Sequence, residues 1–180
     1  MKKILVVLLW IPLFFAGCEK DDICDPSTPT TPRLVVQFFD KNNISLTRYT
    51  TNLKIIGDGM TDDNYLPNES DGVTWNDTLV YLPLKVNANA TKYRLILNAD
   101  DNDLTNDRTD VLEINYKRRD VYISRACGFK TLYDLYGDPL RDPYILNETA
   151  GATAGNWINN IQVVQPQIND ENEVHIRIFF

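Results

Sequence analysis

The sequence predicts an all-β protein, an antiparallel β-sandwich of about eight or nine strands that is immunoglobulin-like or transthyretin-like. Three observations support this prediction. Apolar and polar residues alternate with a period of two in successive short runs, clusters of Gly, Pro, Asn and Asp separate these runs, and no segment shows convincing helical periodicity. A length of 180 residues suits one domain, which we expect over residues 33–180.

The strands follow from the alternation, taken in chain order. Proline at position 83 has no N–H to give to a ladder, so its strand should lie at a sheet edge or carry a bulge. The inward residues of the clearest strands are apolar, and Phe180 is expected to be a core residue of the last strand. The expected strands cover residues 34–39, 53–56, 78–86, 93–97, 112–116, 121–127, 161–165 and 174–180.

Three further segments lie beside or between these strands. The charged residues 117–120, Lys-Arg-Arg-Asp, are expected to form a four-residue hairpin loop. Residues 131–136 fit either one helical turn or a short strand. Residues 166–172 are expected to connect the last two strands as a hairpin.

The N-terminal residues predict export. A basic start, a short apolar run over residues 4–15 and the small residues Ala16 and Gly17 form a secretory signal that is too short to span a bilayer. The Cys18 that follows makes residues 1–17 resemble a bacterial lipoprotein signal peptide, in which this cysteine receives a lipid carrying palmitate-type acyl chains. The alternative is an ordinary cleaved signal followed by an unrelated cysteine.

Residues 18–32 are expected to be a tether, because three prolines in residues 25–32 favour extended backbone. The charged residues 19–22 resemble the export signal of surface lipoproteins in Bacteroidota-type bacteria, although a solvated linker would have the same composition. We therefore expect an outer-membrane, lipid-anchored protein whose domain faces either the medium or the periplasm.

Charge and cysteine content narrow the partners and the compartment. The formal net charge is −7, which argues against nucleic acid as a partner. If Cys18 is acylated, Cys24 and Cys127 remain, and an even number of cysteines in an oxidising compartment favours a disulfide between them. Two buried free thiols are the alternative.

Several segments together resemble one known family. The chain is similar to small flavobacterial lipoproteins that share a domain of unknown function. This resemblance implies the lipid anchor and a β-rich domain, and it implies no activity. The segments that carry it are residues 20–24 (KDDIC), 31–36 (TPRLVV), 52–57 (NLKIIG), 121–128 (VYISRACG) and 174–180 (VHIRIFF).

The most acidic stretch is a weak candidate for calcium. Its residues do not match the EF-hand register, because the sixth position lacks Gly and the twelfth lacks Glu in every frame. The alternative is a solvated loop between two strands. The candidate ligands are Asp100, Asp101, Asp103 and Asp107, and we expect no zinc site and no cofactor.

Trp75 and Trp157 lie in polar surroundings, where an indole face could stack on a sugar. The alternative is that each indole closes one end of the sandwich and donates its N–H to a loop carbonyl. The only histidine, His175, alternates outward from Val174 and Ile176 and is expected to be exposed, without a catalytic role.

These observations favour a non-enzymatic binding or accessory module at the cell envelope, with a glycan or an outer-membrane protein as a possible partner. One alternative is an extracellular polymer hydrolase, which needs two carboxylates in a cleft beside Trp75 or Trp157. Another is a structural subunit of an outer-membrane complex, which needs a large exposed apolar patch.

Overall fold

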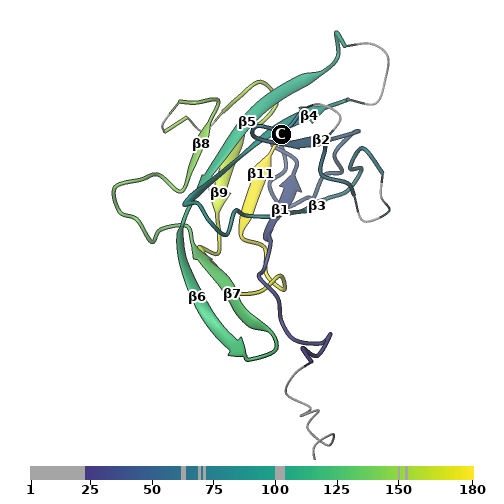
Figure 1. Cartoon of the computed structure of the whole chain (residues 1–180). Helices are drawn as coiled ribbons and strands as arrows, with labels where there is room; N and C mark the ends of the chain where they lie inside the picture. The colour runs from purple at the N-terminus through teal and green to yellow at the C-terminus, as the bar shows by residue number, and fades with distance from the viewer. Residues whose placement is uncertain are drawn as a thin grey trace, which may run out of the picture. The chain divides into compact units, whose positions relative to one another are not determined.

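The computed structural model describes residues 23–61, 64–68, 70, 72–99, 104–149, 151–152 and 154–180 (Figure 1). These residues form eleven strands and no helix, so the all-β prediction is confirmed and the expected number of strands is too small. Accordingly, the described residues include no helix long and apolar enough to cross a membrane.

The chain divides into two compact units. The first unit groups the described residues up to Thr30 with Asp120–Lys130, and the second comprises Thr31–Arg119 and Thr131–Phe180. The predicted bond between Cys24 and Cys127 joins the two segments of the first unit. Every strand of the two larger sheets belongs to the second unit.

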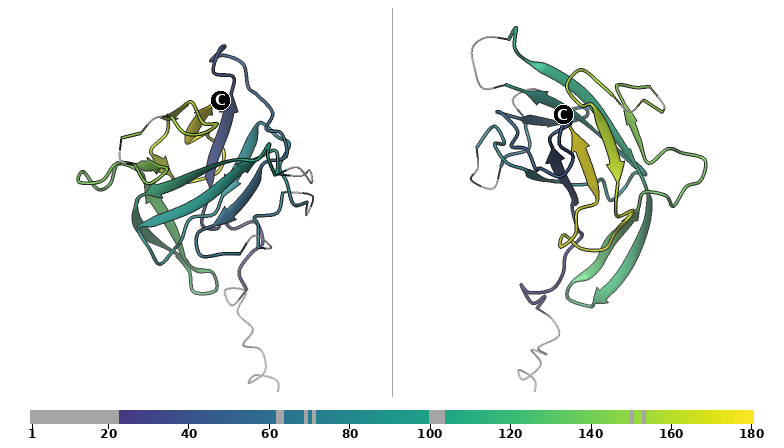
Figure 2. Two further views of the ribbon diagram at one scale, coloured as in Figure 1. Left: turned by 90° about the horizontal axis from the view of Figure 1, so that it is seen from above. Right: turned by 180° about the vertical axis from the view of Figure 1, so that it is seen from behind.

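The first larger sheet contains the first and last strands of the chain side by side. Its order is β3-β1-β11-β9, and its strands are Leu79–Leu82 (β3), Leu34–Phe39 (β1), Ile176–Phe179 (β11) and Asn160–Val163 (β9). The right view of Figure 2 shows β11, in yellow, beside β1, in dark blue. Strand β3 lies at the edge, which is one of the two alternatives that Pro83 left open, and it ends at Leu82, so the expected strand over residues 78–86 is too long.

One strand pair departs from the expected antiparallel arrangement. β1 and β11 are parallel, with Val36 opposite Ile176. Parallel neighbours need a long connection between them, and here most of the domain provides that connection. The other pairs of this sheet are antiparallel, so the prediction of an antiparallel sandwich holds except at this pair.

The second larger sheet has the order β2-β4-β5-β8 and is antiparallel throughout. Its strands are Lys54–Gly57 (β2), Ala90–Leu97 (β4), Arg108–Asn115 (β5) and Tyr144–Leu146 (β8). A third sheet has the order β10-β7-β6, with strands Gln167–Ile168 (β10), Gly128–Asp134 (β7) and Lys117–Ser124 (β6).

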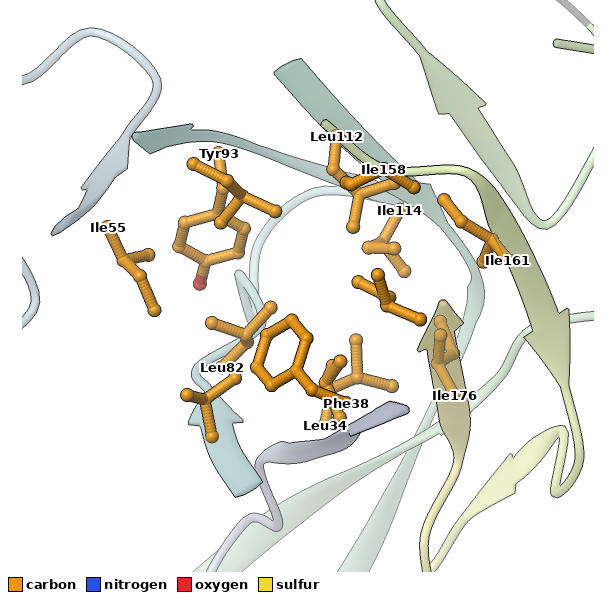
Figure 3. Packing of buried hydrophobic residues seen from close by; sticks show 14 of the residues in the cluster. Leu34, Phe38, Ile55, Leu82, Tyr93, Leu112, Ile114, Ile158, Ile161 and Ile176 are labelled. Carbon is orange, nitrogen blue, oxygen red and sulfur yellow. The ribbon is translucent and has the colours of Figure 1, made fainter. Parts of the chain in front are cut away.

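Apolar side chains from the two larger sheets meet in one core, which confirms the β-sandwich (Figure 3). Phe38 of β1 is 1% exposed, and Tyr93 of β4 and Leu112 of β5 approach from the other sheet. Burial alternates strictly along β4, as period two requires. The immunoglobulin-like or transthyretin-like variant of the sandwich stays a prediction.

The expected loop at residues 117–120 is wrong, because these residues begin strand β6. Charge alone does not make a turn, since an exposed strand face accommodates Lys and Arg. The turn of this hairpin lies at residues 125–127, before Gly128, whose φ of 70° suits a residue without a Cβ. Residues 128–134 form β7, so the strand alternative holds for most of residues 131–136.

The last expected hairpin is present as the antiparallel pair of β9 and β11. Strand β10 lies between them in the sequence and pairs with β7, Ile168 opposite Tyr133. The two- and three-residue strands β10 and β8 were not predicted, because so few residues show no alternation.

Candidate functional site

A cavity of about 300 Å³ lies over part of the third sheet. This volume is at the lower end of the range of small-molecule sites. Strands β6 and β7 and the region of β10 contribute its walls. The lining residues are Lys117, Arg118, Arg119, Leu132, Tyr133, Asp134, Gln167 and Asn169.

The strand pattern explains why polar side chains gather here. Alternate residues of a strand point to the same face, so Lys117 and Arg119 share one face of β6. Gln167 lies directly opposite Asp134 in the β10–β7 pair, which brings these two side chains to one face. Their neighbour Ile168 is fully buried in the core, so the sheet has an apolar face and a polar face.

Three of the lining residues are cationic and one is a carboxylate, so the cavity is positive in a chain whose net charge is −7. Within the described part of the chain, Lys117 and Arg119 form no ion pair. The guanidinium of Arg118 is held in place, because its Nε donates to Asn89 Oδ1 at 2.9 Å and its Nη1 donates to the carbonyl of Val86. The site therefore combines one fixed cation with two that are available.

Buried tyrosines support the cavity from the core side. The rings of Tyr116 and Tyr133 meet edge to face at 5.0 Å between centroids. The Tyr133 hydroxyl donates to Leu84 O at 3.1 Å. A phenol is neutral near pH 7, and burial raises the pKa of Tyr116 further, so this residue does not offset the cations.

A glycine allows the chain to pass close to the cavity wall. A Cβ at Gly137 would lie only 2.5 Å from Cβ of Lys117 and 3.2 Å from the carbonyl oxygen of Asp134. Only glycine fits this approach without movement of the backbone. The segment after β7 therefore packs directly on the stem of Lys117, which limits where its ammonium group reaches.

Chemically, this arrangement is suited to holding an oxyanion. Arg and Lys form strong, charge-assisted hydrogen bonds with carboxylates and phosphates, and the side-chain amides of Gln167 and Asn169 can bond to hydroxyl groups. The lining contains a single carboxylate, Asp134, which accepts the backbone N–H of Tyr136 at 3.0 Å. General acid–base hydrolysis uses two such groups.

A second cavity, of about 270 Å³, is less suited to a ligand although it also contains arginines. Arg48 Nη1 donates to the carbonyl oxygen of Phe180 at 2.6 Å, and its guanidinium lies 4.3 Å from the centroid of the Phe180 ring. Because its polar group already has partners within the chain, Arg48 contributes less to an external site.

Both candidate stacking residues are buried. Trp75 is 4% exposed and its Nε1 donates to Leu66 O at 3.1 Å, and Trp157 is 6% exposed and donates to Leu95 O at 3.1 Å. Leu66 lies in a loop, as the end-closing alternative expects, whereas Leu95 lies on strand β4. Neither indole presents a face on which a sugar can stack, so neither belongs to a binding site in this structure.

Most of the candidate calcium ligands, Asp100, Asp101 and Asp103, lie outside the described residues. Asp107 is described, and its buried Oδ1 has no hydrogen-bond partner among the described residues. The described residues contain no group of three or more His, Cys, Asp or Glu side chains placed to hold a metal ion. Because three of the four candidate ligands lie outside the described residues, the calcium site stays a prediction.

The predicted disulfide is present: Cys24 and Cys127 are bonded, with their Cα atoms 4.8 Å apart. The free-thiol alternative is therefore excluded in this structure. Cys18 and the whole signal segment lie outside the described residues.

The expected exposure of His175 is wrong, because this side chain is only 1% exposed. Its Nδ1 accepts the backbone N–H of Val35 at 3.0 Å. The residue precedes β11, so the outward parity inferred from the strand does not extend to it. Burial lowers the pKa of His175, so the neutral form that accepts this bond is favoured.

Sequence reasoning missed the cationic site, because it assigned residues 117–120 to a loop. Three successive basic residues, Lys-Arg-Arg, were the available signal. The residues that complete the site come from β7 and β10, about 15 and 50 positions further along the chain, and no local pattern links them.

The fold and this site define the class of the protein: an all-β protein with a cationic cavity on one sheet. The chain belongs to a family of unknown function, DUF6452, whose model matches residues 52–180. The matched region includes all the lining residues of the cavity. No curated protein and no solved structure matches the chain.

Proposed function

We propose that this chain is a lipoprotein of the outer membrane, anchored through Cys18, and that its domain is a non-enzymatic binding module of the cell envelope. The ligand is a small molecule or a glycan end that carries a carboxylate or phosphate. The observation that carries this proposal is the cavity of about 300 Å³, in which Lys117 and Arg119 lack carboxylate partners among the described residues.

Two features support the location. The bonded pair of Cys24 and Cys127 suits an oxidising compartment outside the cytoplasm. The apolar run that ends in Ala16, Gly17 and Cys18 has the composition of a lipoprotein signal. Two or three acyl chains hold a protein stably on a membrane.

The chemistry of the cavity favours binding over hydrolysis. A hydrolase of the kind considered above uses two carboxylates in a cleft beside an accessible indole. The cavity has one carboxylate, Asp134, and both indoles that we considered are buried. His175 is buried with its Nδ1 bonded to the backbone, and Cys127 is bonded to Cys24, so neither supplies a nucleophile pair.

The test is calorimetric titration with three probes that share one sugar ring: glucose, glucuronate and glucose 1-phosphate. We expect binding of the charged probes and none of glucose. Lys117→Gln and Arg119→Gln should each weaken the binding of the charged probes about tenfold, because a charge-assisted hydrogen bond is lost. Lys41→Gln removes an equal charge from an exposed residue outside the cavity and is the matched control.

Two outcomes would contradict the proposal. Equal binding of glucose and the charged probes would remove the electrostatic basis of the site. A Lys41→Gln effect as large as that of Lys117→Gln would show a response to net charge only. The anchor is tested separately by the mass of the purified native chain, which should begin at Cys18 and include acyl groups.

A further inference from the structure

The first compact unit exposes a pair of aromatic side chains. The rings of Tyr122 on β6 and Phe129 on β7 meet edge to face, with centroids 5.3 Å apart. Although they contact each other, Tyr122 is 58% exposed and Phe129 is 69% exposed. Ile23, in the N-terminal part of the same unit, is 80% exposed. An exposed aromatic pair is apolar surface that another phase or molecule can cover.

A disulfide holds the N-terminal segment close to the hairpin turn that lies between these two aromatic residues. Cys127, two residues before Phe129, is bonded to Cys24. Cys18 precedes Cys24 by six residues in the sequence, and six extended residues span at most about 20 Å. If Cys18 carries the acyl chains, the hairpin turn is held within about this distance of the membrane surface.

The side chains of this unit suit the boundary between lipid headgroups and acyl chains. Tyrosine is enriched there, because its ring is apolar and its hydroxyl remains hydrated. Arg125 and Lys130 flank the turn and form no ion pair within the described residues, so they can pair with lipid phosphates. Strands β6 and β7 and the Cys24–Cys127 bond restrain the hairpin, so it can present its aromatic and cationic side chains together.

We propose that the membrane carrying the anchor covers this hairpin tip, and that Tyr122 and Phe129 enter its headgroup–acyl boundary. The tip is then a second contact that adds to the acyl chains, since stable membrane attachment commonly combines two signals. This inference rests on the proposed acylation of Cys18, and it is independent of the ligand proposed for the cationic cavity.

The experiment uses the mature acylated chain in vesicles of phosphatidylethanolamine and phosphatidylglycerol with brominated acyl chains. Tyr122→Trp places an indole in the tip, and Tyr136→Trp is the matched control, since Tyr136 is 57% exposed and belongs to the second unit. Trp75 and Trp157 are buried and their emission is subtracted using the unsubstituted chain. We expect a blue shift and a loss of the added emission for Tyr122→Trp, and neither for Tyr136→Trp.

The outcomes separate this inference from the proposed anchor. An acylated chain that floats with the vesicles while the indole at position 122 stays unquenched overturns the tip contact alone. Equal quenching at positions 122 and 136 also overturns it, because the contact would then not belong to the tip. A chain without acyl mass that stays in the aqueous fraction overturns the anchor itself and the tip contact with it.

Discussion

The carboxylate of Asp110 accepts the backbone N–H of Trp157, at 2.9 Å between Oδ2 and N. Asp110 is fully buried on β5. The same Oδ2 accepts the N–H of Ile158, and Oδ1 accepts the N–H of Asn156 at 2.6 Å and the side-chain amide of Asn147 at 2.7 Å. Four donors thus surround one carboxylate, which joins the turn before β9 to the opposite sheet.

The first prediction concerns this carboxylate. In Asp110→Asn, one oxygen becomes an NH₂ group that faces N–H donors, so we expect the free energy of unfolding to fall by about 2–4 kcal/mol. Urea unfolding followed by near-UV circular dichroism measures this difference. Asp107→Asn is the control, because Asp107 Oδ1 has no hydrogen-bond partner within the described part of the chain, and it should change stability by less than about 0.5 kcal/mol. Similar losses in both variants would count against this account.

The second prediction concerns the glycine that allows the carboxylate to approach. A Cβ at Gly155 would lie 2.3 Å from Asp110 Oδ1, and the carboxylate cannot move without breaking its hydrogen bonds. We expect Gly155→Ala to cost about 1–3 kcal/mol in urea unfolding, as overpacking does. In Gly57→Ala, the nearest atom is Sδ of the flexible Met60 at 3.0 Å, so a smaller loss is expected there. The reverse order of the two losses would refute this explanation.

The third prediction concerns the bond between Cys24 and Cys127, which are 103 positions apart in the sequence. Replacing both cysteines with serine removes a restraint on the unfolded chain, and the expected loss is about 3–5 kcal/mol. Urea midpoints with and without a phosphine reductant measure it. The reductant should lower the midpoint of the unsubstituted chain and leave the double variant unchanged, and a reductant effect on the double variant would point to another cause.

The fourth prediction concerns pH. Burial lowers the pKa of His175 below its usual value of 6.5, and the carboxylates of Asp170, Glu173 and Glu171 oppose this shift. The unfolded chain therefore binds the proton more readily, so stability is complete above about pH 6.5 and falls as the pH decreases toward the folded-state pKa. Unfolding free energies from pH 7.5 to 5 should show this loss, and His175→Gln should remove it.

A second group titrates nearby, in a separate pH interval. A hydrogen bond from Arg33 lowers the pKa of Glu171 below 4.5, so the stability that this carboxylate contributes is lost only as the pH falls below about 4.5. A stability loss between pH 6.5 and 5 that persists in His175→Gln would therefore contradict the assignment to His175.

Local patterns in the sequence were sufficient to predict most of the strands. Alternation identified the inward faces of β4 and β5, because a strand in a half-buried sheet must place every second side chain in the core. Pro83 restricted its strand to a sheet edge or a bulge, since an internal strand needs the missing N–H, and the structure places β3 at an edge. The number of cysteines outside position 18 was sufficient to predict a disulfide.

The candidate site could not be derived in this way. Lys117 and Arg119 form a cationic cavity only because β7 and β10 bring Asp134 and Gln167 beside them. In the same way, the buried His175 accepts the backbone N–H of Val35, which is 140 positions away in the sequence.

The sequence by itself thus determined the strand class, and it reduced the position of β3 and the state of Cys24 and Cys127 to two alternatives each, because these follow from the chemistry of residues close in sequence or from their number. Only the tertiary structure decided which polar groups are buried and which cations share a cavity. Burial and cavity charge depend on neighbours from distant segments, and the arrangement of the strands, not the local pattern, determines which segments become neighbours.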